Sequence, residues 1–334
     1  MSESVPERTR EVRLRRYLEH DLTDDLFETV EIDLPVGEVV VRQEYLHVAA
    51  AFGDLMREGC DLPMPPYRPG SRIGGGAVGT VVRSSSAELP VGELVVSFDG
   101  WAEYAAGPAA RFTPVGRGMF PSPAYYLGQG PTAFHGMVDV ARVGPGDVVF
   151  VSGAAGGVGS LAGQIARCRG ASRVIGSAGS PAKVRYLVEE LGFDAAFDYH
   201  DGPVVDRLRE LAPDGVSVFF DNVGGEQFEA ALAVAAHGAR FALCGALASQ
   251  IDGKDGLPRL DVLTAITRGV ELRPFACYHL PEQIAAWFTH FGTWLGEGRF
   301  TYPHTVVEGG LDAAPTTLVG LLRGDFTGNV TVRL

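Results

Sequence analysis

The glycine-rich segment Gly153-Ala-Ala-Gly156-Gly-Val-Gly159 constrains the fold of this chain more than any other feature. It follows an apolar, β-branched run at Val148–Val151 and precedes a segment with helical spacing. A strand, a glycine turn and a helix in this order are typical of a unit that binds a pyrophosphate at the helix N-terminus. The GxxGxxG spacing is a variant of the commoner GxGxxG. We therefore expect a dinucleotide-binding turn.

Alternation of strands and helices continues after this turn and divides the chain into two domains. From 122 to 298 the alternation predicts an α/β domain, a doubly wound parallel sheet with helices on both faces. Before residue 122 the sequence predicts short strands bounded by Gly or Pro, with one helical stretch at 52–58. The last strand, 328–334, has no obvious place in the parallel sheet and is expected to return to the first domain. The predicted domains are 1–121 with 299–334, and 122–298.

The end of the second strand of the parallel sheet indicates which dinucleotide is bound. NAD enzymes place an acidic residue there to hold the ribose 2′-hydroxyl. Here the sequence runs Ser177-Ala-Gly-Ser180-Pro-Ala-Lys183, and Lys183 is one of only two lysines in the chain. A lysine without a neighbouring carboxylate favours a 2′-phosphate. The predicted cofactor is NADPH.

Composition and charge exclude several other classes of protein. The chain has 28 basic and 41 acidic residues, a net charge of −13, which argues against nucleic acid or an anionic membrane as partner. The first twenty residues are charged and predict no secretory signal. Four widely separated cysteines are typical of a reducing compartment. A cytoplasmic location is therefore expected.

The positions of the two lysines exclude two other classes of nucleotide-binding protein. Neither lysine stands in the Gly-Lys-Ser/Thr of a P-loop. A short-chain dehydrogenase has a Tyr four residues before a Lys, but Gly179 and Gln250 occupy those positions.

The order of the domains and four motifs resemble a known family. A β-rich first domain, a mid-chain Rossmann unit and a returning strand are similar to the medium-chain dehydrogenase/reductase superfamily. Within 144–245, VGPGDVVFVSGAAGGVGSLAGQIA, GSPAKVRYLVEELGFDAAFDY, DGVSVFFDNVGGEQFEAAL and ARFALCGA resemble its zinc-independent branch of prostaglandin and 2-alkenal double-bond reductases. DLMREG at 54–59 is more similar to the quinone oxidoreductases. The resemblance implies a GroES-like domain joined to a Rossmann domain.

The resemblance also implies a set of residues that contact NADPH. The glycine motif would lie at the pyrophosphate, the residues after the second strand at the 2′-phosphate, and the rest along the cofactor towards the nicotinamide. In that order they are Gly153, Ala155, Gly156, Gly157, Val158 and Gly159; Ser180, Lys183 and Tyr199; and Thr132, Asn222, Cys244, Gly245, Ala246 and Phe275.

The sequence predicts no metal site. Where zinc-dependent relatives carry a Gly-His-Glu motif, this chain reads Gly74-Gly-Gly-Ala-Val-Gly79, and Cys60 is the only cysteine of the first domain. Glu44 is the only acid or cysteine close enough to His47 in the sequence to share a metal ion with it. Alcohol oxidation without zinc would lack its Lewis acid, whereas reduction of an activated C=C bond needs none.

The predicted function is reduction of an activated carbon–carbon double bond. Hydride addition at the β-carbon of an enone, enal or polyene leaves negative charge on the carbonyl oxygen, which needs a hydrogen-bond donor. The family Tyr after the CGA segment is absent from 247–252. The replacement candidates are Tyr278, Tyr45 and Gln250.

Other functions remain open at this point. The same hydride transfer could start a reductive cyclisation in bacterial polyketide-type secondary metabolism, or the protein could reduce quinones. A non-catalytic NADPH-binding structural protein is the alternative outside enzymology. In each enzymatic case the partner is a small unsaturated molecule, and a homodimer is expected.

Overall fold

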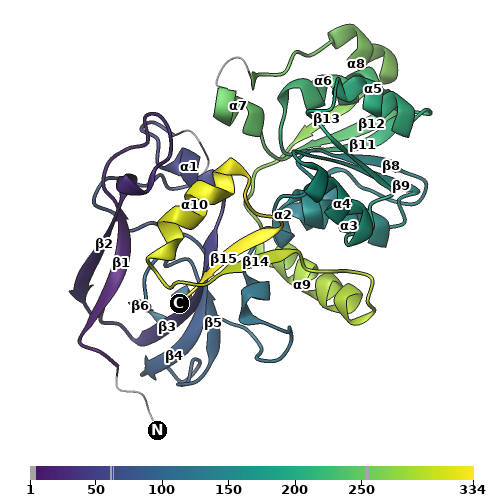
Figure 1. Cartoon of the computed structure of the whole chain (residues 1–334). Helices are drawn as coiled ribbons and strands as arrows, with labels where there is room; N and C mark the ends of the chain where they lie inside the picture. Colours follow the sequence, from purple (N-terminus) through teal and green to yellow (C-terminus); the bar gives the residue numbers. More distant parts are fainter. Residues whose placement is uncertain (1–4, 61, 63, 253–255) are drawn as a thin grey trace. The chain divides into compact units, whose positions relative to one another are not determined.

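Two sheets that share no strand organise the chain into two units (Figure 1). The computed structural model describes residues 5–60, 62, 64–252 and 256–334. The β-rich unit comprises Met1–Gly128 and His304–Leu334, and the Rossmann unit comprises Gln129–Pro303.

The Rossmann unit is built on a six-stranded sheet in the order β10-β9-β8-β11-β12-β13, in which every pair is parallel. The chain order reverses between β8 and β11, and ligands of such sheets bind at the carboxyl ends of the strands around this switch point. The strands are β8 (Val148–Val151), β9 (Arg173–Ala178), β10 (Ala195–Asp198), β11 (Val216–Asp221), β12 (Ala235–Leu243) and β13 (Glu271–Pro274).

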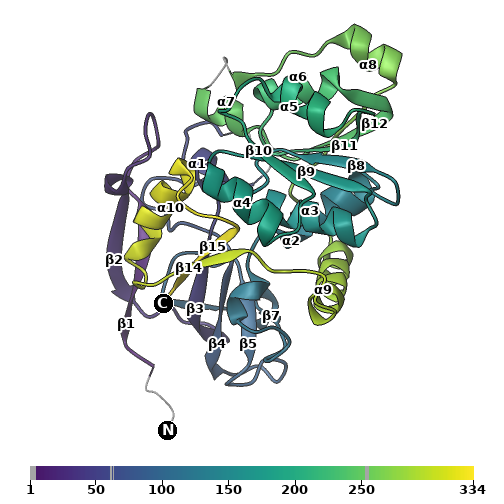
Figure 2. The same cartoon turned by 45° about the vertical axis from the view of Figure 1, so that its right-hand side comes forward.

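Helices cover both faces of this sheet, with α3 and α4 on one face and α5 and α6 on the other (Figures 1 and 2). Phenylalanine rings stack between neighbouring strands of the sheet. The rings of Phe150 on β8 and Phe219 on β11 lie 5.0 Å apart at an interplanar angle of 8°. The helices are α2 (Gly130–His135), the π-helix η4 (Gly136–Val140), α3 (Gly159–Cys168), α4 (Pro181–Glu189), α5 (Val204–Leu211), α6 (Gly225–Ala233), α7 (Leu247–Asp252), α8 (Val262–Arg268) and α9 (Pro281–Gly296).

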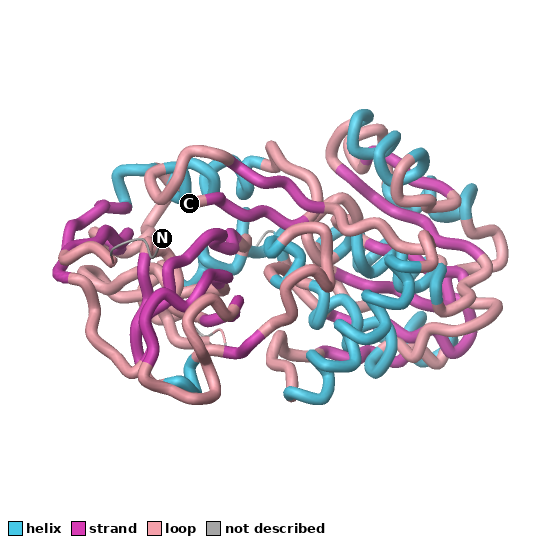
Figure 3. The backbone as a smooth tube through the Cα atoms, turned by 90° about the horizontal axis from the view of Figure 1, so that it is seen from below, coloured by secondary structure: helices cyan, strands magenta, loops and turns pink. Residues whose placement is uncertain are grey.

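The β-rich unit consists mostly of strands and loops (Figure 3). Its main sheet has the order β14-β15-β3-β4-β5-β7, with β6 also paired to β3, and β1 and β2 form a separate hairpin. The strands are β1 (Arg8–Leu14), β2 (Phe27–Asp33), β3 (Val39–Val48), β4 (Ala77–Ser84), β5 (Leu94–Ser97), β6 (Tyr104–Gly107), β7 (Thr113–Pro114), β14 (His304–Val307) and β15 (Asn329–Arg333). The helices are η1 (Asp24–Leu26), α1 (Ala51–Leu55), η2 (Ala109–Arg111), η3 (Pro123–Tyr126) and α10 (Ala313–Arg323).

The last strand of the chain returns to the first unit, as the sequence predicted. β15 runs antiparallel to β3, with Val330 opposite Val48 and Arg333 opposite Tyr45. Both valines are buried in a core that surrounds Trp101. The two units therefore confirm the predicted fold class, a β-rich domain joined to a doubly wound parallel sheet.

One predicted element is shorter in the structure: the helix expected at 52–58 is α1 (Ala51–Leu55). The last strand of the parallel sheet, β13, ends at Pro274. Proline lacks the N–H that continues a ladder, so the chain leaves the sheet there. Tyr278 consequently lies in a loop, four residues beyond the strand. Within the described part of the chain, no helix is long and apolar enough to cross a bilayer.

Candidate cofactor site

A buried polar network holds the glycine-rich turn at the end of β8. The Ser152 hydroxyl donates to Asp221 Oδ1 at 2.7 Å. The Asn222 backbone N–H donates to Ser152 Oγ at 2.8 Å, and its side-chain amide donates to the Ser152 carbonyl at 2.7 Å. Asn222, a predicted cofactor residue, therefore fixes the turn across the switch point between β8 and β11.

Asp221 is the centre of this network, and the sequence analysis did not identify it. Its Oδ1 also accepts hydrogen bonds from the N–H groups of Val223 and Gly224, at 3.0 and 2.9 Å. Burial raises the pKa of Asp221, while these hydrogen bonds stabilise its charged form. The sequence feature that could have identified Asp221 is a single acidic residue at the end of an apolar strand, in the sequence Phe-Phe-Asp-Asn.

Two hydrogen bonds to the buried Ser177 hold the turn against β9. Ser177 Oγ accepts from the Gly153 N–H at 3.3 Å, and the Ser177 carbonyl accepts from the Ala154 N–H at 2.8 Å. The Ser177 hydroxyl donates in turn to the side-chain carbonyl of Gln227 on α6. Strand β9 thus positions the turn, and Gln227 was also missed by the sequence analysis.

The glycines of the motif have different structural roles. Gly153 has a φ of 58°, a left-handed conformation that favours glycine. A Cβ on Gly159 would lie 2.5 Å from the Gly153 carbonyl oxygen, so the backbone of the turn excludes any side chain there. A Cβ on Gly156 would meet only that oxygen, at 3.4 Å, an ordinary contact. The fold therefore needs Gly153 and Gly159 but leaves room at Gly156.

The helix that follows the turn begins without a side-chain cap. α3 starts at Gly159 after Val158, which offers no capping oxygen. An uncapped helix N-terminus presents backbone N–H groups and a positive dipole end to an anion. The open space at Gly156 and this terminus fit a pyrophosphate group, with Ala155, Gly157 and Val158 in the same segment.

The predicted 2′-phosphate residues gather around the loop after β9. Ser180 caps α4 by accepting the Lys183 N–H at 3.3 Å. The Tyr199 N–H donates to the Ala178 carbonyl at 3.1 Å, and a Cβ on Gly179 would lie 2.8 Å from the Tyr199 hydroxyl. Asp198, the acid that precedes Tyr199, is buried and bonded to His200 at 2.8 Å. Hydroxyls and one lysine suit a phosphate.

The remaining predicted residues lie around the ends of β11, β12 and β13. The N–H groups of Cys244 and Gly245 donate to the Asp221 carbonyl at 2.8 and 3.0 Å. A Cβ on Gly245, which precedes Ala246, would lie 2.9 Å from the Asn222 carbonyl oxygen. Phe275 packs edge-on against Phe220 at 6.1 Å.

Thr132 joins this region from α2. Its hydroxyl is hydrogen-bonded to His279 Nε2 at 2.9 Å. Burial, with the nearby His135, lowers the pKa of His279 to about 4, so the imidazole is neutral at pH 7. Its Nδ1 is buried and has no hydrogen-bond partner among the described residues. No local pattern in the sequence identifies His279, because its place in the site depends on contact between α2 and a loop 147 residues away.

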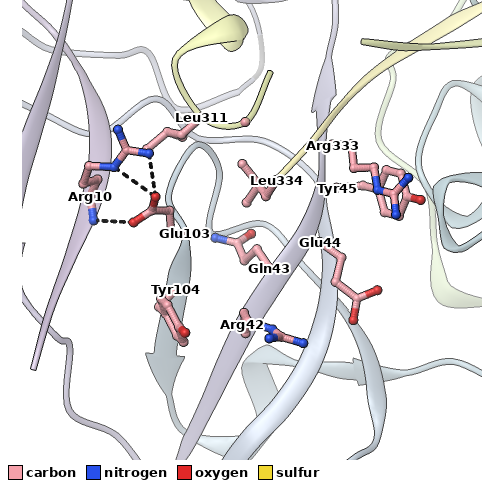
Figure 4. Close-up of a pocket in the computed structure, with 11 residues that line it drawn as sticks. Arg10, Arg42, Gln43, Glu44, Tyr45, Glu103, Tyr104, Leu311, Arg333 and Leu334 are labelled. Carbon is pink, nitrogen blue, oxygen red and sulfur yellow. Dashed lines mark hydrogen bonds and ion pairs between the residues drawn. The ribbon is translucent and has the colours of Figure 1, made fainter. Parts of the chain in front are cut away.

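The predicted catalytic tyrosines lie in different units. Tyr278 is 57% exposed, next to His279 in the Rossmann unit. Tyr45 lies on β3 of the β-rich unit, where it lines a pocket of about 630 Å³ (Figure 4). Figure 4 shows Tyr45 beside Arg333, its neighbour on β15. Gln250 lies on α7.

The histidine considered as a metal ligand packs against an aromatic ring of the β-rich unit. His47 packs edge-on against Phe52 at 6.3 Å, and burial lowers its pKa to about 4. Among the described residues, no group of three or more His, Cys, Asp or Glu side chains is arranged to hold a metal.

Comparison with known proteins supports the resemblance in both units. A family model described as "N-terminal domain of oxidoreductase" matches residues 10–115, and one described as "Zinc-binding dehydrogenase" matches residues 157–291, inside the Rossmann unit. NADPH-dependent curcumin reductase of Escherichia coli (strain K12) is 31% identical, over 89% of this chain and 88% of that protein.

A plant enzyme and a crystal structure are also similar to this chain over most of its length. 2-Alkenal reductase (NADP(+)-dependent) of Nicotiana tabacum is 32% identical over 91% of this chain and 90% of its own. The structure of CurA in complex with NADPH from Vibrio vulnificus superposes with a TM-score of 0.87 at 29% identity, and the match covers 97% of this chain and 98% of that one. The chain therefore belongs to the medium-chain dehydrogenase/reductase superfamily, in the zinc-independent branch that contains the prostaglandin and 2-alkenal reductases.

Proposed function

We propose that this protein is an NADPH-dependent reductase of activated carbon–carbon double bonds in small unsaturated carbonyl compounds. The observation that carries the proposal is the turn at Gly156, open to a ligand beneath the uncapped N-terminus of α3. Two relatives that match 89% and 91% of this chain are named as NADPH-dependent curcumin reductase and 2-alkenal reductase.

The residues of the chain would bind and orient the cofactor and the substrate, and would balance the charge that develops during the reaction. Bound NADPH supplies a hydride for the β-carbon of the substrate. The turn at Gly153–Gly159 would bind the pyrophosphate, and Ser180, Lys183 and Tyr199 the 2′-phosphate. Phe275 and Thr132 would limit the space beside the nicotinamide. The oxygen that gains charge needs a donor, for which Tyr278, Tyr45, Gln250 and the neutral His279 are the candidates.

Substitution of Lys183 by Ala is expected to weaken NADPH binding and leave NADH binding nearly unchanged. The lost interaction is a charged hydrogen bond to the 2′-phosphate, which is worth roughly 1.5–3 kcal/mol. Titration of the purified protein with both cofactors measures the effect. Arg185→Ala is the matched control, because Arg185 is an exposed cation on the same helix. An equal loss for the two cofactors would refute the assignment.

The proposed mechanism needs no metal. We expect metal analysis to find less than stoichiometric zinc, and chelators to leave the rate of enone reduction unchanged. One zinc per chain, together with loss of activity on chelation, would contradict the proposal. The metal would then be the group that polarises the carbonyl of the substrate.

The reaction itself is tested by following NADPH consumption with a simple enone, an enal and a quinone. Saturation of the C=C bond, seen in the product mass, supports the proposal. A quinone reduced faster than any enone would favour the quinone reductase. A product with an additional ring from a polyene would favour the reductive cyclase, and NADPH binding without turnover of any substrate would favour the structural protein.

We further propose that the chain forms a homodimer through the Rossmann unit. β13 is an edge strand of the sheet, and its open side leaves backbone groups for a second copy. Apolar side chains near this edge are exposed, including Leu263 (71%) and Ile266 (70%) on α8. Light scattering should give twice the chain mass of 35.5 kDa, and Leu263→Asp with Ile266→Asp should give one chain mass. A wild-type monomer would contradict the proposal.

The cytoplasmic location also stays a proposal. It rests on the four cysteines, all of which are free in the structure.

A further inference from the structure

Two cysteines lie together at the carboxyl ends of β12 and β13. These strands are parallel neighbours, and Leu243 is paired with Pro274. Cys244 follows the first strand directly, and Cys277 lies three residues beyond the end of the second. A hydrogen bond of 3.3 Å from the Phe275 N–H to the Leu243 carbonyl keeps the two segments together past the last strand pair.

The surroundings make the two thiols unequal. Hydrogen bonding from the Cys244 thiol and the Thr132 hydroxyl lowers the pKa of Cys277 to about 7. The same bond to Cys277, together with burial, raises the pKa of Cys244 well above its ordinary value. Cys277 is exposed, whereas Cys244 is half-buried. An accessible thiolate beside a protonated thiol is the arrangement in which one sulfur reacts first and the other resolves the product.

We propose that Cys244 and Cys277 form a site of reversible oxidation, at which a hydroperoxide converts the two thiols into a disulfide. The Cys277 sulfur attacks the peroxide and the O–O bond breaks, which gives a sulfenic acid and an alcohol after protonation. The Cys244 sulfur then attacks the Cys277 sulfur and displaces hydroxide, which leaves as water with the Cys244 proton. The two thiols are oxidised, and the hydroperoxide is reduced to one alcohol and one water.

The disulfide is expected to alter the site described above. Its S–S bond is about 2.05 Å long, much shorter than a hydrogen bond between thiols. The loop at Phe275–His279 must therefore shift towards Cys244-Gly245-Ala246, and Thr132 loses its thiolate partner. We expect oxidation to weaken NADPH binding. This consequence rests on the proposed function, whereas formation of the disulfide does not.

The test treats the full-length protein with hydrogen peroxide. Intact-mass measurement should show the loss of two hydrogen atoms, non-reducing peptide mapping should join Cys244 to Cys277, and dithiothreitol should reverse both. Cys277→Ser and Cys244→Ser should each abolish the link. Cys60→Ser and Cys168→Ser are the matched controls and should retain it.

Several results would overturn the proposal: no link after peroxide, a link that uses Cys60 or Cys168, or stable sulfinic acid on Cys277 while Cys244 stays reduced in the wild type. NADPH affinity is measured on the same samples before and after treatment. A link that leaves NADPH affinity unchanged overturns the expected consequence. A protein that forms the link but never binds NADPH refutes the proposed function and leaves the thiol site standing.

Discussion

Replacement of Gly156 by Val is expected to abolish NADPH binding while the fold survives. A Cβ at this position contacts only the Gly153 carbonyl oxygen, at 3.4 Å, and Gly156 is not among the glycines with positive φ. The branched side chain would instead fill the space where a pyrophosphate must approach the backbone. We expect affinity to fall by more than about 100-fold, or about 2.8 kcal/mol.

Fluorescence titration with NADPH measures the loss, and a thermal melt followed by circular dichroism checks the fold. Gly159→Val separates the two effects, because a Cβ there would lie 2.5 Å from the Gly153 oxygen and 2.8 Å from the Ala154 Cα. That variant should lower the melting temperature, whereas Gly156→Val should not. Wild-type affinity in a folded Gly156→Val protein would mean that the turn has no ligand.

The parts of the site that the sequence predicted are those set by local backbone requirements. The turn at Gly153–Gly159 needs a left-handed residue at its first position and no side chain at its last, and both requirements are visible in the spacing. Ser180 and Lys183, both predicted at the 2′-phosphate, are also local to one helix, which Ser180 caps in the structure. Such features depend on neighbours in the chain, so a single sequence reveals them.

The parts that the sequence did not predict depend on contacts between distant segments. Ser152 meets Asp221 only because β8 and β11 are adjacent at the reversal of strand order, 69 residues apart in the chain. Cys244 meets Cys277 only because β13 follows β12 in the sheet and ends at Pro274. Helix α8 was missed as well: it is only seven residues long, and no residue in it is buried.

Substitution of Tyr278 by Phe is expected to slow turnover by roughly 10²–10³, the usual effect of losing one oxyanion donor. The structure places this phenol in the loop after β13, beside His279 and three residues beyond Phe275. Its hydroxyl belongs to a side chain that is 57% exposed, so the phenol is free to meet a bound carbonyl group. NADPH affinity should stay unchanged, because the hydroxyl would act only when charge develops on the substrate.

Single-turnover kinetics with an enone measures this step apart from product release. Tyr186→Phe, a tyrosine on α4 at the opposite end of the predicted cofactor, is the matched control and should turn over at the wild-type rate. Wild-type turnover of Tyr278→Phe would exclude the phenol as donor. In that event His279→Phe becomes the decisive variant, because this neighbour of Tyr278 can donate from its Nδ1, which has no partner among the described residues, in the tautomer in which Nε2 accepts the Thr132 hydroxyl. A pH-independent rate between pH 5 and 8 in the wild type would then be expected, since a pKa of about 4 keeps His279 neutral throughout that range.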